Sequence, residues 1–297
     1  MAWAQAGIGY HGRSHPLQRT AATDDWKKAT RLTIHESKPR GVLHQRLAGV
    51  LEHQRHAPTQ ALAPFVEHYW RVRWDLHGHP PQTQETLPHP NVQLVLEAGQ
   101  SRIYGVHSGR FVRVLEGRGT VFGVKFRVGG FHPFLRRPVA TLADSSLAII
   151  AVLPGAAALE KEVLAADSME AMAAIADCHL LAHLPPSDPQ VARVGALVAR
   201  AAADPALCSV QTLAAEAGIT VRTLQRLFGQ YVGVAPKWVI NRYRLHEAIE
   251  RLQAGRTVAW AELALALGYF DQAHFIRDFT HLVGSPPGEY ARREGPL

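Results

Sequence analysis

The sequence predicts an α+β fold with an N-terminal β-rich domain and an all-helical C-terminal domain. Between residues 61 and 147, short runs of β-branched and aromatic residues alternate with turn signals rich in glycine, proline and asparagine. From residue 156 onward, apolar residues recur at three- and four-residue spacing, which is the period of a helix. Within the last hundred residues, a helix-turn-helix pattern is written twice.

The composition is that of a globular chain without a membrane span. Its 297 residues are 47% hydrophobic and 19% charged, enough for about two domains. The net charge of +7 permits a polyanionic partner. Cys178 and Cys208 are too few for a disulfide framework or a four-thiolate zinc site. No apolar run approaches the roughly 20 residues of a membrane helix, and the start lacks a signal peptide's apolar run, so we expect a cytoplasmic protein.

The N-terminal half divides into a tail and a β-rich domain. Residues 1–45 are polar and lack a sustained period, so we expect a mostly disordered tail. Residues 46–150 are expected to form an antiparallel barrel or sandwich, because short strands follow one another at even spacing. The expected strands lie in the segments HYWRVRW, NVQLVLEAG, SRIYGV, GRFVRVLEG and GTVFGVKFRV. The segment FHPFLRRP, which follows Gly129-Gly130, is expected to form a short helix.

Residues 151–187 are expected to form a helical hairpin and a linker. Two Ala/Leu-rich helices, at 156–166 and 168–184, meet at Asp167, which has the spacing of a capping box with Glu170. The acidic balance of this segment favours packing or dimerisation over contact with nucleic acid. A new domain, residues 188–297, then begins at Asp188-Pro189, an N-cap followed by a proline at the first helical position.

This C-terminal domain contains a diverged internal repeat. Gly218 recurs as Gly268, fifty residues later, and Pro236 recurs as Pro287, fifty-one residues later. Each copy reads as a helix, a glycine-centred turn and a second helix, followed by a glycine, a proline and a further helix. The repeat therefore predicts two helix-turn-helix motifs in tandem.

The second helix of the first copy has one apolar and one polar face. It follows the turn at Gly218 and a capping residue, Thr220. Its apolar face is made of Leu224, Leu227, Phe228 and Tyr231. The opposite face carries Arg222, Gln225, Arg226 and Gly229. Guanidinium and amide groups can make bidentate bonds to guanine and adenine in a major groove. A solvated helix face would have the same composition, but the repeat favours base reading.

The second copy has the same design, and one helix joins the two. Its apolar face is made of Phe275, Phe279 and Leu282, with His274, Arg277 and His281 opposite and Gln272 at the helix start. Between the copies, APKWVINRYRLHEAIERLQAG predicts an amphipathic helix of about 27 Å. A rod of this length can hold two reading helices near the roughly 34 Å that separates successive major-groove faces.

These motifs resemble the AraC/XylS family of bacterial transcription regulators from about Pro189 to Arg293. The most specific segments are LAAEAGITVRTLQRLF, GVAPKWVINRYRLHEAIERL and LALGYFDQAHFIRDFTHLVGSPPGEYAR. The resemblance implies a sequence-specific, DNA-binding regulator that works with RNA polymerase. By position, it implies DNA contacts from Arg222, Thr223, Gln225 and Arg226 in the first motif, and from Gln272, Ala273, His274 and Arg277 in the second. Ile276 and Phe270 depart from the family's usual residues.

The N-terminal half resembles an effector-type domain that precedes such DNA-binding domains in many relatives. The segments that carry this resemblance are FVEHYWRVRW, LPHPNVQLVLEAG and VFGVKFRVGGFHPFL. It implies either a regulatory role, in which the domain binds a small-molecule effector, or an oligomerising role, in which it forms a homodimer. We expect an apolar cavity with Trp70, Trp74, Tyr104, Phe111, Phe122 and Phe126 as candidate lining residues. The alternative is that these aromatic side chains simply fill the core.

Signals for an enzyme are weak, and no cofactor is expected. His77, His79 and Glu85 have some similarity to a metal-binding loop of a cupin, but Pro80-Pro81 intervenes and a surface turn fits as well. Both cysteines have the local sequence of small core residues. The alternative to a regulator is an enzyme with a metal- or substrate-binding β-rich domain and an accessory helical module.

Overall fold

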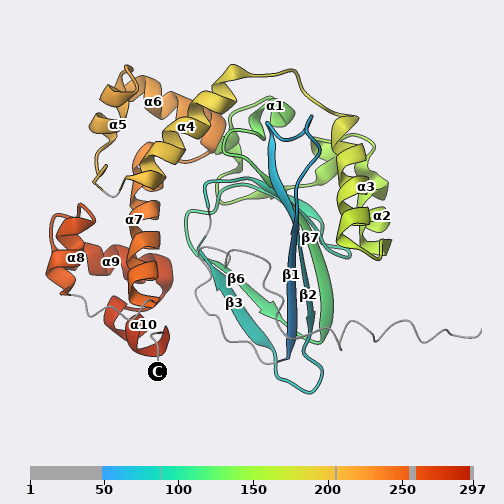
Figure 1. Cartoon of the computed structure of the whole chain (residues 1–297), viewed down its shortest axis with the longest axis horizontal. Helices are drawn as coiled ribbons and strands as arrows, with labels where there is room; N and C mark the ends of the chain where they lie inside the picture. Colours follow the sequence, from blue (N-terminus) through green and yellow to red (C-terminus); the bar gives the residue numbers. More distant parts are fainter. Residues whose placement is uncertain (1–48, 88, 205, 254–258, 295–297) are drawn as a thin grey trace, which may run out of the picture. The chain divides into compact units, whose positions relative to one another are not determined.

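The computed structural model describes residues 49–294 except 88, 205 and 254–258 (Figure 1). The expected tail at residues 1–45 lies outside the described residues. By their contacts, all described residues fall in one compact unit. Among the described helices, none combines the length and apolar character that crossing a membrane requires.

The N-terminal part is built on antiparallel strands, as predicted. Its strands are β1 (Val50–His56), β2 (Val66–Asp75), β3 (Gln82–Thr86), β4 (Gln93–Leu96), β5 (Arg102–Tyr104), β6 (Phe111–Leu115), β7 (Arg118–Phe126) and β8 (Ser146–Leu147). Six of them form one sheet in the order β1-β2-β7-β4-β5-β8, and β3 pairs with β6 in a second sheet. The described strands thus form two open antiparallel sheets and do not close into a barrel.

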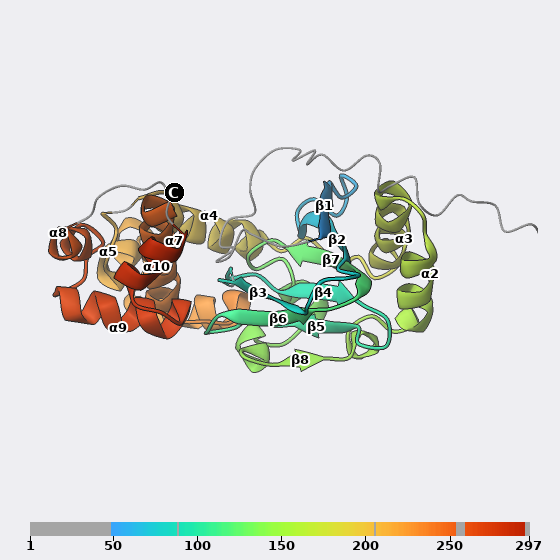
Figure 2. The ribbon, with the colours of Figure 1, turned by 90° about the horizontal axis from the view of Figure 1, so that it is seen from below.

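The two faces of the large sheet have different neighbours. One face contributes Tyr69 and Phe122 to a core shared with α1 (His132–Leu135), α2 (Leu159–Ala165) and α3 (Met169–Leu181). The opposite face contributes Trp74 and Val121 to a smaller cluster that includes Leu115 of β6. Figure 2 shows α2 and α3 beside the sheet. Short turns of 3₁₀-helix, η2 (Val139–Leu142), η3 (Ile149–Ala151) and η4 (Ala156–Ala158), lead from α1 to the hairpin.

The helical hairpin α2–α3 belongs to this core by its packing. Met172 and Ala176 of α3 lie in the same buried cluster as the aromatic residues of the sheet. The cap of α3 is Ser168, whose hydroxyl accepts from the Ala171 N–H, so the prediction of Asp167 was wrong by one residue. Cys178 is exposed on this helix, which corrects its interpretation as a core residue.

The C-terminal part is entirely helical among its described residues. It comprises α4 (Pro189–Ala203), α5 (Val210–Glu216), α6 (Val221–Leu227), the π-helix η5 (Phe228–Val232), α7 (Pro236–Gln253), α8 (Trp260–Ala266), α9 (Gln272–Val283) and α10 (Pro287–Glu294). Asp188 caps α4 by accepting from the Gln190 N–H at 2.9 Å, as its Asp-Pro start predicted.

The long helix α7 holds two separate cores. Val239 and Ile240 near its start pack with α4, α5 and α6, whereas Leu245 and Ile249 pack with α8, α9 and α10. Figure 1 shows these two sets of helices along α7. The helix has 18 residues, so it is about 27 Å long, as expected from the sequence.

A buried arginine of α7 closes the first of these cores. Arg244 is 2% exposed, and its guanidinium donates to the carbonyls of Ala201, Asp204 and Leu207. These carbonyls lie at the end of α4 and in the loop after it, where helical partners run out. Arg244 therefore ties this loop to α7.

Candidate nucleic-acid interface

The first reading helix, α6, is positioned by a glycine turn and a threonine cap. Gly218 has φ +64°, a left-handed conformation that favours glycine. The Thr220 hydroxyl accepts from the Thr223 N–H at 3.1 Å, as the sequence predicted. Leu224 and Leu227 are buried below the helix. The side chains of Arg222, Gln225 and Arg226 are exposed, and Thr223 is half-buried beside them.

The second reading helix, α9, repeats this arrangement. Gly268 makes the turn with φ +74°, and the Asp271 carboxylate caps α9 by accepting from the His274 N–H at 2.7 Å. Phe275 and Phe279 are fully buried. Of the predicted contact residues, Gln272, Ala273 and Arg277 are exposed, and His274 is half-buried.

The outer faces of α6 and α9 offer complementary chemistry to a base edge. Arg222, Arg226 and Arg277 provide guanidinium donors, while Gln225 and Gln272 provide amides. The distance between His274 Nε2 and a carboxylate oxygen of Asp278 is 3.6 Å. The negative charge of this carboxylate offsets part of the positive charge of α9. The two helices therefore carry different sets of donors and acceptors.

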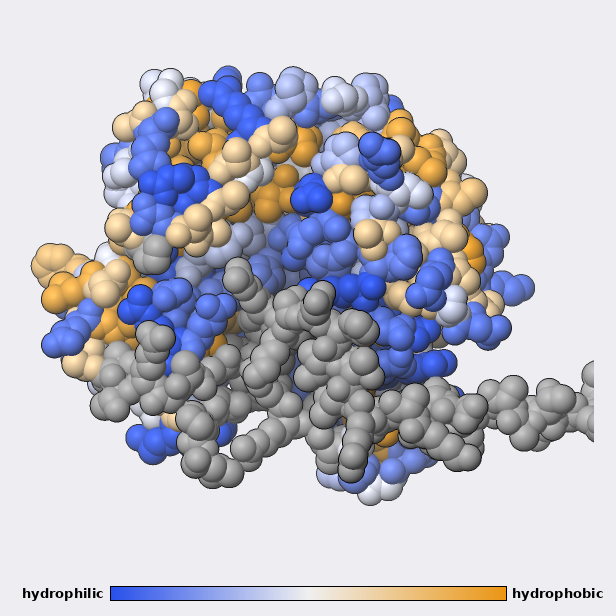
Figure 3. All heavy atoms as spheres, viewed as in Figure 1, coloured by the Kyte–Doolittle hydropathy of each residue, from blue (hydrophilic) through white to orange (hydrophobic). Residues whose placement is uncertain are grey.

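Apolar side chains also reach the surface near α9. Phe270 is 89% exposed in the turn before this helix, and Leu265 of α8 is 66% exposed. Figure 3 shows hydrophobic atoms at the left edge of the molecule, where α8 lies, among mixed polar and apolar side chains elsewhere. Phe270 thus enlarges the turn outward and leaves the core below it intact.

Loops of the N-terminal part contact the second motif and the linker helix. Arg110 Nη1 donates to the carbonyl of Val283, the last residue of α9, at 3.2 Å. The Trp238 indole N–H donates to the Ser108 carbonyl at 3.2 Å. Leu87 is 1% exposed and belongs to the core of the second motif. The structure thereby joins the β-rich domain to the reading helices, which the sequence alone did not predict.

The structure does not bring all the candidate effector residues together. Trp70 and Trp74 pack on the face of the large sheet that carries Val121. Phe122 and Phe126 lie on the opposite face, fully buried in the main core. Tyr104 is half-buried and lies 6.2 Å from the His107 ring. A single cavity lined by all of these residues is therefore wrong, and Phe122 and Phe126 are core residues.

The cations beside these aromatic residues have partners. Arg71 is buried and bonds Glu52, Arg113 pairs with Glu97, and Lys125 Nζ lies 2.9 Å from a Glu67 oxygen. The side chain of Phe111, also considered as a lining residue, is 38% exposed. Arg71, Arg113 and Lys125 thus each have a carboxylate partner within the β-rich domain.

The histidine-rich loop after β2 is held by ordinary contacts. The His77 imidazole lies 2.6 Å from an Asp75 oxygen, and Glu85 pairs with Arg110 at 3.3 Å. Within the described ranges, no group of three or more His, Cys, Asp or Glu side chains could hold a metal ion. His77 and Glu85 of the cupin-type interpretation thus have different partners.

Sequence reasoning missed a polar group beside α9. Lys237 and Asn241 lie one turn apart on α7, and with Tyr269 and His274 they line a small pocket. Their spacing of four residues on the polar face of an amphipathic helix was a signal, but the position of Tyr269 depended on the packing of two motifs.

Comparisons with known proteins agree with this geometry. A family model described as a helix-turn-helix domain matches residues 213–293, which include both reading helices. The C-terminal domain therefore contains a helix-turn-helix domain. The chain is accordingly a DNA-binding transcription regulator. A second model, described as a domain of unknown function (DUF6597), matches residues 54–148 of the β-rich domain. No curated protein matches the sequence.

Solved structures similar to parts of this chain include named regulators. A probable AraC family transcriptional regulator from Rhodopseudomonas palustris CGA009 is 27% identical over 34% of this chain and 94% of its own, with a TM-score of 0.31. The DNA-binding domain of AdpA, solved with a target DNA, is 27% identical over 36% of this chain and 93% of its own, with a TM-score of 0.29. ToxT from Vibrio cholerae is 12% identical over 84% of this chain and 98% of its own, with a TM-score of 0.34.

Proposed function

We propose that the chain reads two successive major grooves of its operator, one with each motif. In this proposal, α6 contacts one half-site through Arg222, Thr223, Gln225 and Arg226, and α9 contacts the next through Gln272, Ala273, His274 and Arg277. One observation carries it: each reading helix buries its apolar face and leaves base-reading side chains exposed along the other. The roughly 27 Å length of α7 supports a spacing close to one helical turn of DNA.

Single alanine substitutions test whether α6 and α9 contact different half-sites. Arg226→Ala should cost about 1–3 kcal/mol of binding free energy at one or two base pairs and relax the preference there. Arg277→Ala should have the same effect about one helical turn away. Both can be measured by selecting bound sites from random DNA with the wild type and each variant. An equal loss of affinity for every sequence would mean that these side chains contact phosphates, and the assignment would fail.

The β-rich domain modulates this reading through its contacts with the second motif. The Arg110 guanidinium lies at the carboxyl end of α9, where the helix dipole concentrates negative charge. The bond from Trp238 to Ser108 holds α7 to the same loop. A small-molecule effector, a second copy of the chain or RNA polymerase acting on the β-rich domain would thus reach α9 through residues 108–110.

Removal of the Arg110 contact tests this route. Arg110→Ala should lower affinity for the second half-site about five-fold and leave the first half-site unchanged, because α9 loses part of its pre-organised position. Footprinting of each half-site against protein concentration measures this directly. Arg118→Ala, an exposed strand position in the same domain, is the control. Tighter binding by Arg110→Ala would show that the contact inhibits reading, and unchanged binding would remove Arg110 from the route.

A further inference from the structure

The turn before α9 is one residue longer than the turn before α6. In the first motif a single residue, Ile219, lies between the turn glycine and the cap of α6. In the second motif two residues, Tyr269 and Phe270, lie between the turn glycine and the cap of α9. The two turns otherwise share a left-handed glycine and a side-chain cap. The extra residue is therefore what distinguishes them.

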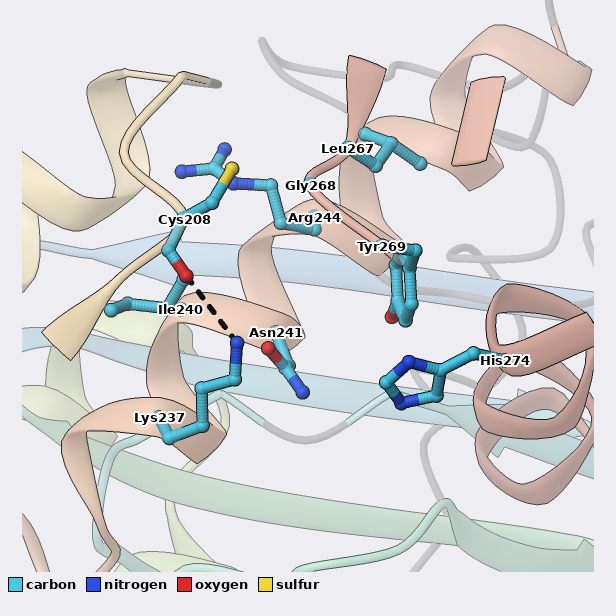
Figure 4. Close-up of a pocket in the computed structure, with 9 residues that line it drawn as sticks. All are labelled: Cys208, Lys237, Ile240, Asn241, Arg244, Leu267, Gly268, Tyr269 and His274. Carbon is cyan, nitrogen blue, oxygen red and sulfur yellow. Dashed lines mark hydrogen bonds between the residues drawn. The ribbon is translucent and has the colours of Figure 1, made fainter. Parts of the chain in front are cut away.

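Tyr269 packs in the second motif as Ile219 packs in the first. An apolar residue just before a helix commonly contacts the fourth residue of that helix. Ile219 packs against the buried cluster that contains Leu224, the fourth residue of α6. The Tyr269 ring lies 5.4 Å from the ring of Phe275, the fourth residue of α9. Figure 4 shows the buried Tyr269 beside His274, so this position of the turn is already filled.

Phe270 is therefore not needed for the packing of the second motif. Its side chain is 89% exposed and lies outside the buried core of this motif. A small polar residue would suit a turn better than an aromatic one. Apolar surface in water is unfavourable, so an exposed ring is stabilised when another apolar group covers it. Folding alone thus gives no reason for a phenylalanine here.

The position of Phe270 favours DNA as the group that covers it. The residue directly precedes Asp271, the cap of α9, and the next two residues, Gln272 and Ala273, are exposed. A reading helix contacts base edges with its N-terminal residues. Phe270 is thus continuous with the proposed contact surface of α9. The exposed Leu265, in contrast, belongs to α8 and precedes the turn.

The chemistry of the ring limits what it can recognise on a base pair. A phenyl group has no hydrogen-bond donor or acceptor, so it cannot pair with the polar groups of a base edge. The apolar group that the major groove offers is the C5-methyl of thymine, and phenylalanine is one of the side chains that contact it. Such a contact separates thymine from cytosine without a hydrogen bond.

We propose that Phe270 recognises a thymine of the second half-site by covering its C5-methyl group. The inference rests on the proposed reading of two grooves and adds a base preference that the polar residues of α9 do not supply. The longer turn gives this contact to the second motif. In the first motif the matching turn holds only Ile219, which packs against the core.

Phe270→Ala in the full chain tests the contact. In a selection of bound sites from random DNA, the variant should lose the preference for thymine at one position of the second half-site and keep every other preference. Affinity for the operator should fall about three- to four-fold, the usual effect of uncovering one methyl group. The melting temperature should stay unchanged because the side chain is exposed. Phe270→Leu, which keeps an apolar side chain, should retain most of the preference.

A change in the DNA identifies the group that is contacted. Deoxyuridine in place of the selected thymine removes only the methyl group. Wild-type protein should lose affinity about three- to four-fold on this DNA, and Phe270→Ala should lose nothing further. The matched control is Leu265→Ala, which removes an exposed apolar side chain of α8 and should bind both DNAs as the wild type does.

Three results would overturn the proposal. The first is equal binding of wild-type protein to the thymine and deoxyuridine operators. The second is a loss of affinity in Phe270→Ala that is the same for every sequence, because the ring would then contact the DNA backbone. The third is unchanged DNA binding by Phe270→Ala and Leu265→Ala with weaker recruitment of purified RNA polymerase, which would make this surface a protein contact. A uniform loss of affinity in Arg226→Ala and Arg277→Ala would instead show that groove reading itself has failed, and the thymine contact would fall with it.

Discussion

Phe279→Ala should destabilise the second helix-turn-helix motif by about 3–5 kcal/mol and abolish its contact with DNA. Phe279 is fully buried, and its ring lies 5.7 Å from that of Phe275 and 5.8 Å from that of Tyr290. Truncation leaves a cavity at the point where α9 and α10 meet, and a core surrounded by helices on several sides collapses only in part. Loss of α9 should leave protection of the first half-site only.

The control for this prediction lies in the same motif. Phe270 is 89% exposed, so Phe270→Ala should change stability by no more than about 0.5 kcal/mol. Urea unfolding followed by circular dichroism compares the two variants, and footprinting gives the half-site affinities. Equal midpoints for Phe279→Ala and Phe270→Ala would contradict the burial of Phe279.

Arg244→Met should destabilise the first motif by about 3 kcal/mol. The substitution keeps much of the side-chain volume but leaves the carbonyls of Ala201, Asp204 and Leu207 without the guanidinium. Each buried acceptor left unpaired costs about 1–3 kcal/mol, and water entering the loop recovers part of this. Hydrogen exchange should quicken at the end of α4 and in the loop after it.

Another arginine of α7 separates this effect from a general loss of charge. Arg251 is half-exposed and pairs with Glu247 one turn away, with 2.9 Å between Nε and a carboxylate oxygen. Arg251→Met should cost about 0.5 kcal/mol, the usual worth of such surface pairs. If both variants lose the same small amount, the bonds of Arg244 do not hold the loop.

The helix-turn-helix motifs were predictable because their signals are local. Gly218, Thr220 and the apolar residues of α6 lie within a few turns of one another, and each specifies a turn, a cap or a buried face by its own chemistry. Residues that the repeat placed on the outer faces, such as Arg226 and Arg277, are exposed in the structure. Asp271, the cap of α9, fits the same rule.

The β-rich domain was less predictable because strand pairing is not local. The alternation of side chains along a strand correctly places neighbours such as Tyr69 and Trp70 on opposite faces. It does not say which faces of two different strands lie on the same side of the sheet. The register opposes Arg71 to Phe122, which puts Phe122 on the face away from Trp70. Strands β1 and β3 were also missed, since VLEHQRH and QTQET carry few of the residues typical of strands. Lys237 and Tyr269 meet only through the packing of separate motifs.

Leu87 has a consequence for the order of folding during synthesis. This side chain belongs to the core of the second motif, yet it leaves the ribosome well before Leu245, Phe275 or any other partner in that core. Contacts so distant in sequence form late and slowly, and N-terminal domains fold first during translation. The core of the second motif therefore forms around Leu87, which the folded β-rich domain already holds in place. A chain whose β-rich domain has misfolded would therefore have a defective second helix-turn-helix motif. Correct folding of the β-rich domain is thus a condition for DNA binding by this motif.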